Sequence, residues 1–519
     1  MKSGWWSKGK MQVLWSTSSG VMVHKFRSSI FGGRFFHFVR VDFLLSGECN
    51  GSLCGVARNG VVIFEWSNQR VFRCDDICGP SIHRHLFFLL QLITCYLITN
   101  MNIVKQSTKF IKPAVPTPST LRRYKTGFID ELAPIMNVSI VLFFSANDNH
   151  NPNFVTRLEQ SLAKILPRFY PLAGRYMDEV YTIDCNDEGV EFIHAKVNIK
   201  LQDILVSTDA NVKFVDEFVP SMTRDATYPL LAIQVTMFEC GGMTLGVSSP
   251  HKIVDASTLC TFISEWATMN RGSENEIEFT GHAFNSSSLF PGRCFKPIPL
   301  RVISDADMSC KYIRKIYSFS ESAISNMKAN HQHWSKIQLV SAIIWKALID
   351  VDRVNNNNPS EYILLQPVNL RGKTSSLIPK HSCGNFWGYC VTQAGTVETT
   401  EELADRLTAN VKKTKNYLSK VDHNTEEGQL MVLSCILPKN IRDTSSVITI
   451  TSWSKFPFYE LDFGFGKPTW VAPGCVPVVN ISCLMDQAQG NGVDAHIVLE
   501  AKDVPCFEKA LQSIDCFAA

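Results

Sequence analysis

The sequence lacks an excess of charge of either sign. Its 519 residues contain 51 Lys and Arg against 48 Asp and Glu, a formal net charge of +3. Proteins that bind nucleic acid in bulk depend on many cationic contacts with phosphates, so this balance excludes nucleic acid as the main partner. Because 45% of the residues are hydrophobic and 19% charged, the chain can build two or more cores, and disorder, collagen and coiled coil are excluded.

The sequence also lacks a secretory signal and a long apolar run. Lys2, Lys8 and Lys10 precede a mixed polar stretch, whereas a signal peptide needs about 7–15 apolar residues there. The best apolar run, residues 86–99, is shorter than the roughly 20 residues of a membrane-spanning helix. We therefore expect a cytoplasmic protein, with an enzyme tethered to a membrane through 86–99 as the alternative.

Regular cysteine spacing is absent as well. The 17 cysteines are an odd number scattered along a chain too long to need disulfides in place of a core, which favours reduced thiols. Cys74 and Cys78, followed by His83 and His85, do not have the spacing of zinc ligands. No bound metal is expected.

Residues 1–100 differ in composition from the rest of the chain. They hold 11 of the basic residues but only 5 acidic ones, together with 4 of the 10 Trp. We interpret them as an atypical, poorly ordered N-terminal extension and Met101 as the working start of the enzyme. A stretch rich in Ser, Pro and Gly, residues 285–308, then divides the remainder into predicted domains at 101–300 and 301–519.

Hydrophobic periodicity predicts strands and helices in both halves. In the first half, residues 138–144 form a predicted buried strand, 231–237 and 243–247 a hairpin turning at Gly241-Gly242, and 154–166 and 259–266 predicted helices. In the second half, 312–319 is a predicted strand, and helices are predicted around 340–348 and 401–417. This mixture indicates an α/β protein of two similar-sized parts.

His251 follows the second strand of the predicted hairpin and precedes a helix. Such a junction can present a side chain to a cleft, and imidazole can take and return a proton near neutral pH. Asp255 follows four residues later, but His-x-x-x-Asp alone is common by chance, and a structural histidine fits it equally.

A second cluster contains Thr451-Ser452-Trp453 and, a few residues on, Asp462-Phe463-Gly464-Phe465-Gly466. The glycines lack phosphate-loop spacing, which favours a tight turn. The sequence contains no Gly-x-Gly-x-x-Gly, Gly-x-Ser-x-Gly or His-Glu-x-x-His, so dinucleotide enzymes, esterases and zincins have no local support.

Together, His251-x-x-x-Asp255 and Asp462-Phe463-Gly464-Phe465-Gly466 resemble the two signature motifs of the plant BAHD acyl-CoA-dependent acyltransferases. The resemblance covers residues 101–519. Phe238-Glu239-Cys240-Gly241-Gly242 and His251-Lys252-Ile253 are most similar to the vinorine synthase-like branch. Phe465 replaces the Trp of the usual second motif, and Pro250 replaces a Ser before the histidine. Supporting stretches are 116–118, 169–175, 368–371 and 383–385.

The resemblance implies a fold and a mechanism. The fold is a two-domain chloramphenicol acetyltransferase-like α/β architecture, with a mixed sheet and flanking helices in each domain and an active-site channel between them. A segment near 464–488 is expected to pack with the first domain. His251 would be the general base, and Trp453 and Thr451 would donate hydrogen bonds to the oxyanion, although core packing is an alternative role for Trp453.

The same resemblance assigns the other motif residues. It implies that Asp255 pairs with Arg371 rather than with His251, and that Asp462, Gly464 and Gly466 form a structural turn. Contacts with the acyl-CoA co-substrate are expected from the second half, where the candidates are Gly384, Asn385 and Ser335.

Branch similarity favours acetyl-CoA as donor and a hydroxylated alkaloid or terpenoid as acceptor, with no bound cofactor and a monomeric enzyme. Malonyl transfer to flavonoids is less favoured, because Cys383-Gly384-Asn385 stands where a Tyr-Phe-Gly-Asn-Cys pattern would be. A non-catalytic relative that binds acyl-CoA or a partner is the alternative function.

Overall fold

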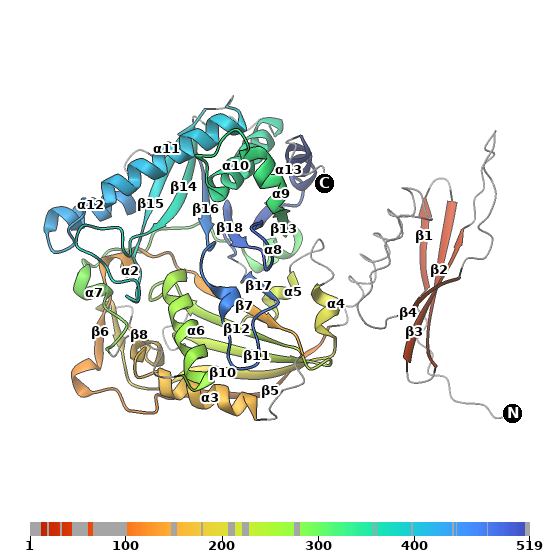
Figure 1. The fold of residues 1–519 in the computed structure, drawn as a ribbon, viewed down its shortest axis with the longest axis horizontal. Coiled ribbons are helices and arrows are strands. Elements are labelled where there is room, and N and C mark those ends of the chain that lie inside the picture. The colour runs from red at the N-terminus through yellow and green to blue at the C-terminus, as the bar shows by residue number, and fades with distance from the viewer. Residues whose placement is uncertain are drawn as a thin grey trace. The chain divides into compact units, whose positions relative to one another are not determined.

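A computed structural model describes most of the chain from Met101 onward (Figure 1). Of the first hundred residues it describes only the backbone of four strands. The described ranges are 12–17, 20–31, 34–43, 61–65, 101–146, 153–177, 180–205, 213–220, 228–273, 281–355, 359, 361–395, 398–438, 441–442, 444–474 and 476–513.

The first unit, residues 1–85, contains one antiparallel sheet with the strand order β1-β2-β3-β4. The predicted poor order of residues 1–100 stays a prediction. The apolar run 86–99 and the group Cys74, Cys78, His83 and His85 lie outside the described residues. The strands are β1 (Gln12–Thr17), β2 (Gly20–Phe31), β3 (Arg34–Phe43) and β4 (Val61–Glu65).

The second unit begins at Leu86 and contains two mixed six-stranded sheets. The first sheet has the order β17-β7-β12-β11-β10-β5 and is antiparallel except between β10 and β11. Its strands are β5 (Ile103–Ile111), β7 (Asn137–Phe144), β10 (Val190–Val197), β11 (Ala232–Phe238), β12 (Met243–Pro250) and β17 (Trp470–Pro473).

The predicted hairpin is confirmed: β11 and β12 pair antiparallel, with Val235 opposite Leu245. The predicted strand 138–144 is β7, which borders β12 on its other side. The far neighbour of β7 is β17, which comes from the second half of the chain and places Trp470 opposite Phe143. The first sheet therefore includes a strand from the segment expected to pack with the first domain.

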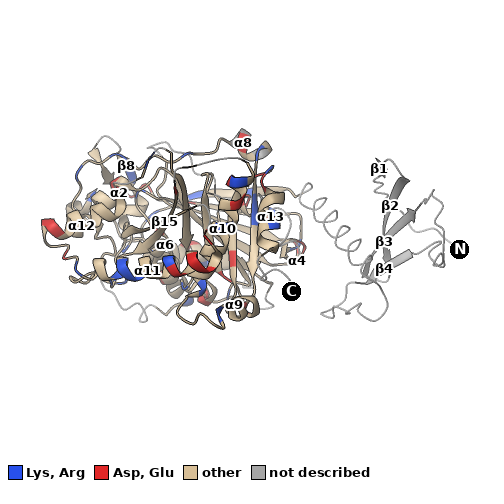
Figure 2. Cartoon of the chain, turned by 90° about the horizontal axis from the view of Figure 1, so that it is seen from above, with Lys and Arg blue, Asp and Glu red and all other residues tan. Residues whose placement is uncertain are grey.

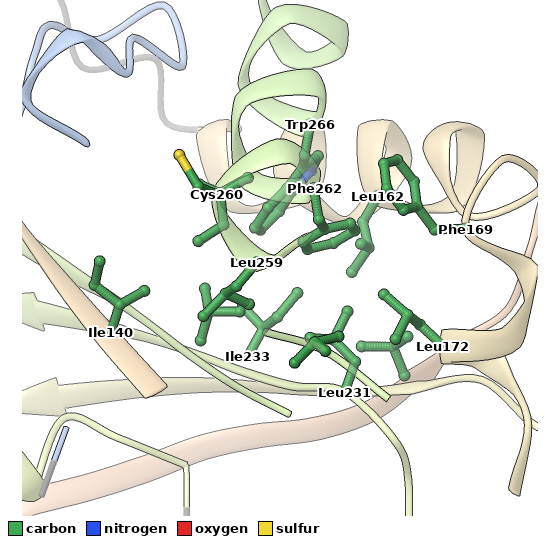
Figure 3. Close-up of a cluster of buried hydrophobic side chains, with 14 of the residues drawn as sticks. Ile140, Leu162, Phe169, Leu172, Leu231, Ile233, Leu259, Cys260, Phe262 and Trp266 are labelled. Atoms are coloured by element: carbon green, nitrogen blue, oxygen red, sulfur yellow. The ribbon is translucent and has the colours of Figure 1, made fainter. Parts of the chain in front are cut away.

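Two helices, α3 and α6, cover one face of the first sheet. Leu259, Phe262 and Trp266 of α6 point toward strand residues such as Ile233, with Leu162 of α3 beside them (Figure 3). All are fully buried or nearly so, which makes this the main core of the first half. The helices of this half are α2 (Phe128–Leu132), α3 (Phe154–Ile165), α4 (Leu201–Leu205), α5 (Lys213–Asp216), α6 (Ala256–Arg271) and α7 (Ser286–Leu289).

The second sheet has the order β13-β19-β18-β16-β14-β15. The predicted strand 312–319 is β13 with the same bounds. The core under this sheet includes Trp345 and Ile344 of α10. Its strands are β13 (Tyr312–Phe319), β14 (Tyr362–Asn369), β15 (Trp387–Ala394), β16 (Ser446–Ser452), β18 (Ile481–Asp486) and β19 (Val493–Glu500).

All described helices of the second half except α13 begin with a side-chain cap. Acidic and basic residues both lie on helices of this half (Figure 2). In α11, Glu401 and Glu402 lie in the first turn and Lys415 in the last, which favours the helix dipole at both ends. The helices are α8 (Asp305–Cys310), α9 (Glu321–Lys328), α10 (Lys336–Val354), α11 (Thr400–Leu418), α12 (Glu426–Ile436) and α13 (Val504–Gln512).

Three short strands, β6 (Arg123–Lys125), β8 (Arg175–Met177) and β9 (Thr182–Asp184), form a small separate antiparallel sheet. The two large sheets and their helices confirm the predicted two-domain α/β architecture. The site residues come from the ends of β12, β14 and β16 and from the start of β15.

Candidate active site

His251 is the first residue after β12, at the turn that leads into α6. Its backbone N–H donates to the carbonyl of Met136 at 2.8 Å, and its own carbonyl accepts from Asn385 Nδ2 at 2.7 Å. One contact comes from the first half of the chain and the other from the second. The backbone of this residue is therefore held from both sides.

The imidazole of His251 is partly enclosed by protein. Its Nδ1 atom is buried and has no hydrogen-bond partner among the residues that the structure describes, and its ring meets Trp387 edge-on, with centroids 6.2 Å apart. Burial lowers the pKa of His251 below its ordinary value of 6.5, although the negative charge of Asp255 acts in the opposite direction. The ring is therefore neutral at pH 7, which is the form that can accept a proton.

This lowered pKa predicts the pH dependence of turnover. A general base loses activity as pH falls through its pKa, so the acid limb of kcat/KM should have its midpoint below pH 6.5. The measurement is kcat/KM between pH 5 and 8 with one acyl-CoA and one acceptor. A midpoint at or above 6.5 would contradict the neutral, buried base.

Asp255 does not face the imidazole of His251. Its carboxylate accepts from both terminal nitrogens of Arg371, at 2.8 and 3.0 Å, and from the backbone N–H groups of Thr258 and Phe386 at 2.8 and 3.0 Å. Both of its oxygens are thus occupied, one of them by the cap of α6. The ion pair that the resemblance implied between Asp255 and Arg371 is present.

This ion pair is deeply buried. Arg371 is 2% exposed in its side chain and Asp255 10%. Burial alone would raise the pKa of Asp255, but the charge and hydrogen bonds of Arg371 outweigh it and lower the pKa. Arg371 also donates to the carbonyls of Ser382 and Gly384, so the pair joins the turn after β12 to the segment before β15.

Thr451 and Trp453 lie at the end of β16, on the second sheet. Trp453 is 9% exposed and packs in the same core cluster as Phe458, while its backbone N–H donates to Leu484. Within the described ranges, neither the Thr451 hydroxyl nor the Trp453 indole N–H makes a hydrogen bond. Their role at an oxyanion stays a prediction.

The side chain of Asp462 stabilises the turn that follows it. Its Oδ1 accepts from the backbone N–H groups of Gly464 and Gly466 at 2.7 and 3.1 Å. Both glycines have positive φ, 92° and 103°, which only glycine adopts readily. Asn270 at the end of α6 donates to the carbonyl of Phe463, and the Phe463 ring packs on Trp266. The contacts with Asn270 and Trp266 hold the turn against α6.

Gly384 and Asn385 lie beside the His251 turn. Gly384 has φ 117°, and a Cβ there would come 2.4 Å from the Cβ of Ser286, so a larger residue does not fit. Asn385 is fully buried, and Asp130, His251 and Trp387 bind its side chain. Contact of these two residues with acyl-CoA stays a prediction, while the structure gives both of them contacts within the protein.

Ser335 is the third candidate for the co-substrate. Its hydroxyl accepts from the backbone N–H of Gln338 at 3.2 Å and caps α10. Its contact with acyl-CoA stays a prediction. Sequence reasoning missed Asp130 and Trp387, since neither lies in a recognisable motif.

Within the described ranges, no group of three or more His, Cys, Asp or Glu is arranged to hold a metal ion. Among the same residues, no helix is both long and apolar enough to cross a membrane.

Sequence comparison extends across this site and the whole of both large sheets. The model of a family described as "Transferase family" matches residues 101–514. A Salvia splendens protein, pelargonidin 3-O-(6-caffeoylglucoside) 5-O-(6-O-malonylglucoside) 4'''-malonyltransferase, is 32% identical over 79% of this chain and 99% of its own. Vinorine synthase of Rauvolfia serpentina is 30% identical over 79% and 97%.

The chain belongs to the BAHD acyltransferase family. It is therefore an enzyme that transfers an acyl group from acyl-CoA to a small-molecule alcohol. The BAHD fold is also found by structure: the crystal structure of vinorine synthase matches with a TM-score of 0.69 and 29% identity, over 80% of this chain and 98% of the other.

A more distant structure shares the BAHD fold alone. The TRI101 protein of F. sporotrichioides, crystallised with coenzyme A and T-2, matches with a TM-score of 0.56 and 18% identity, over 74% of this chain and 97% of the other. Among sequence relatives, limonoid 1-O-acetyltransferase of Citrus sinensis is 31% identical over 79% of this BAHD chain and 97% of its own. Both acetyl and malonyl transfer are thus named among its relatives.

Proposed function

We propose that this BAHD enzyme transfers the acetyl group of acetyl-CoA to a hydroxyl of an alkaloid or terpenoid alcohol, with His251 as general base. The proposal rests on the position and surroundings of the His251 imidazole. It follows β12 directly, burial keeps it neutral, and Asp255 is turned away to Arg371. The donor and acceptor class rest on branch similarity and on relatives named as limonoid acetyltransferases.

The proposed reaction needs no covalent enzyme intermediate. His251 takes the proton of the acceptor hydroxyl while the oxygen attacks the thioester carbonyl. When the tetrahedral intermediate collapses, the C–S bond breaks and the proton passes from the imidazolium to the departing sulfur. The products are the ester and free CoA thiol, and the histidine is neutral again.

The oxyanion of that intermediate would be stabilised by Trp453 and Thr451. Within the described ranges the indole N–H of Trp453 makes no hydrogen bond, although Trp453 as a whole is only 9% exposed. The hydroxyl of Thr451 is equally uncommitted there. Both donors remain for a ligand in the proposed channel between the two halves, which supports the assignment.

Malonyl transfer is the second candidate, because a malonyltransferase is among the relatives at 32% identity. The sequence lacks the pattern associated with flavonoid malonylation, which places acetyl transfer first. We further propose that the enzyme is a cytoplasmic monomer. The cysteines among the described residues are all free thiols, which fits a reducing compartment.

The test supplies the full-length protein with acetyl-CoA or malonyl-CoA and a pool of alkaloid and terpenoid alcohols. Released CoA thiol and the mass of each product are measured. We expect thiol release that depends on the alcohols, with products one acetyl group heavier. Thiol release with malonyl-CoA but not with acetyl-CoA would show that malonyl-CoA is the donor. No release with either donor, while acetyl-CoA still binds, would support the non-catalytic alternative.

A further inference from the structure

The side-chain amide of Asn385 is held in one orientation by three partners. Its Nδ2 donates to Asp130 Oδ1 at 3.0 Å and to the His251 carbonyl at 2.7 Å, while its Oδ1 accepts from the indole of Trp387 at 3.1 Å. Reversing the amide would place a carbonyl oxygen against two acceptors and an NH2 against a donor. Its two N–H groups and its oxygen are therefore each assigned by their partners.

Asp130 binds both the backbone and the side chain of Asn385. Asp130 is 1% exposed, and its carboxylate accepts from the backbone N–H and side-chain amide of Asn385, from Gly127 N–H at 2.8 Å and from the Ser286 hydroxyl at 2.5 Å. All these donors are neutral, and within the described ranges no cation pairs with it. Burial accordingly raises the pKa of Asp130 to about 6, while the same hydrogen bonds oppose the rise.

A buried carboxylate without a cationic partner lowers the stability of the folded protein. In this protein the Asp130 carboxylate orients the Asn385 amide, so that the amide points at the backbone carbonyl of the proposed base. Four residues along, the Asp255–Arg371 pair holds the other end of the same turn, and Phe386 N–H binds Asp255. Consecutive residues of the second half thus fix both ends of the turn that carries the imidazole.

We propose that Asp130 and Asn385 are positioning residues for His251: Asp130 orients the Asn385 amide, and Asn385 holds the backbone carbonyl of His251 and the Trp387 ring beside the imidazole. The inference rests on the proposed role of His251 as base. Neither residue touches the reacting atoms. Their effect on rate passes entirely through the placement of the imidazole, for which errors near 1 Å can cost about 10²-fold.

The test replaces Asn385 by aspartate in the full-length protein. Asn385→Asp keeps the shape, removes both N–H donors and places a carboxylate against Asp130. Asn270→Asp is the matched control, because Asn270 is also buried and its amide also donates to a backbone carbonyl, that of Phe463. Asp130→Asn is the second variant, should Asn385→Asp fail to fold.

We expect kcat of Asn385→Asp to fall about 30- to 100-fold, with KM for the acyl-CoA within about threefold of the parent. Both variants should lower Tm, because each replaces a buried amide, but Asn270→Asp should keep kcat within about threefold of the parent. In a His251→Ala background, Asn385→Asp should cause no further loss of the residual rate, because it acts through His251. Equal kcat losses in Asn385→Asp and Asn270→Asp, or multiplicative losses with His251→Ala, would overturn the inference.

A second measurement does not depend on turnover and so separates this inference from the proposed function. Histidine labelled with ¹³C at Cε1 gives an NMR signal for His251, assigned by its absence in His251→Ala. Asn385→Asp should shift or broaden that signal and Asn270→Asp should not. An unchanged His251 signal in Asn385→Asp would refute the positioning role even if no substrate is turned over.

Discussion

His251→Ala is expected to lower kcat by about 10²–10⁴-fold, the usual contribution of a positioned general base. The substitution removes a ring whose Nδ1 has no hydrogen-bond partner in the described part of the chain, while the backbone contacts to Met136 and Asn385 remain available to alanine. The fold should therefore survive the change. Acceptor deprotonation, rather than acyl-CoA binding, is what the variant loses.

The measurement is thiol release at saturating acyl-CoA and acceptor, together with the circular dichroism spectrum and the affinity for acyl-CoA. His381→Ala is the control, because His381 is an exposed histidine in the segment before β15. A rate within tenfold of the parent, with an unchanged spectrum, would remove His251 from the mechanism.

Arg371→Ala is expected to lower the free energy of unfolding by about 3–5 kcal/mol, the cost of leaving one partner of a buried ion pair alone. Asp255 would lose two of its four donors and remain buried with a negative charge. The turn that carries His251 is held by the same pair. Turnover in the folded fraction should therefore fall as well.

Chemical denaturation at pH 7 measures this change, with Arg406→Ala as the control. Arg406 binds Glu398 through two nitrogens, but its side chain is 48% exposed, and such surface pairs contribute about 0–1 kcal/mol. Similar losses of unfolding free energy in Arg371→Ala and Arg406→Ala would contradict the prediction that the buried pair contributes more than the exposed one.

The Arg371 effect should also depend on pH. Because the pKa of Asp255 is lowered in the folded protein, the stability it contributes is present above its unfolded pKa of about 3.9 and is lost as pH falls through the folded value. The stability difference between parent and Arg371→Ala should therefore shrink in acid. A difference that grows below pH 4 would argue against the sign of this shift.

Much of the frame around His251 could be predicted from local patterns. Alternation of apolar residues and the Gly241-Gly242 turn are sufficient to predict β11 and β12, and helical spacing after Asp255 is sufficient for α6. These signals are local because strand and helix periodicity repeat within a few residues. The pairing of Asp255 with Arg371 needed the family resemblance, since no spacing rule connects them.

Asp130 and Asn385 could not be predicted in their observed roles. They lie 255 residues apart in sequence, and a single Asp in a five-residue helix resembles any helix-capping residue. The family resemblance instead predicts contact of Asn385 with the co-substrate. Only the three-dimensional structure shows that its amide is used within the protein, since long-range hydrogen bonds leave no periodic signal.

Strand β17 makes completion of the first sheet a late event in synthesis. Its partner β7 emerges from the ribosome on the order of three hundred residues earlier, as the pairing of Phe143 with Trp470 shows. Until then the open edge of β7, with its buried apolar side chains, can pair with other chains or aggregate. A nascent or truncated chain that ends before Trp470 should therefore need chaperone protection that the finished enzyme does not.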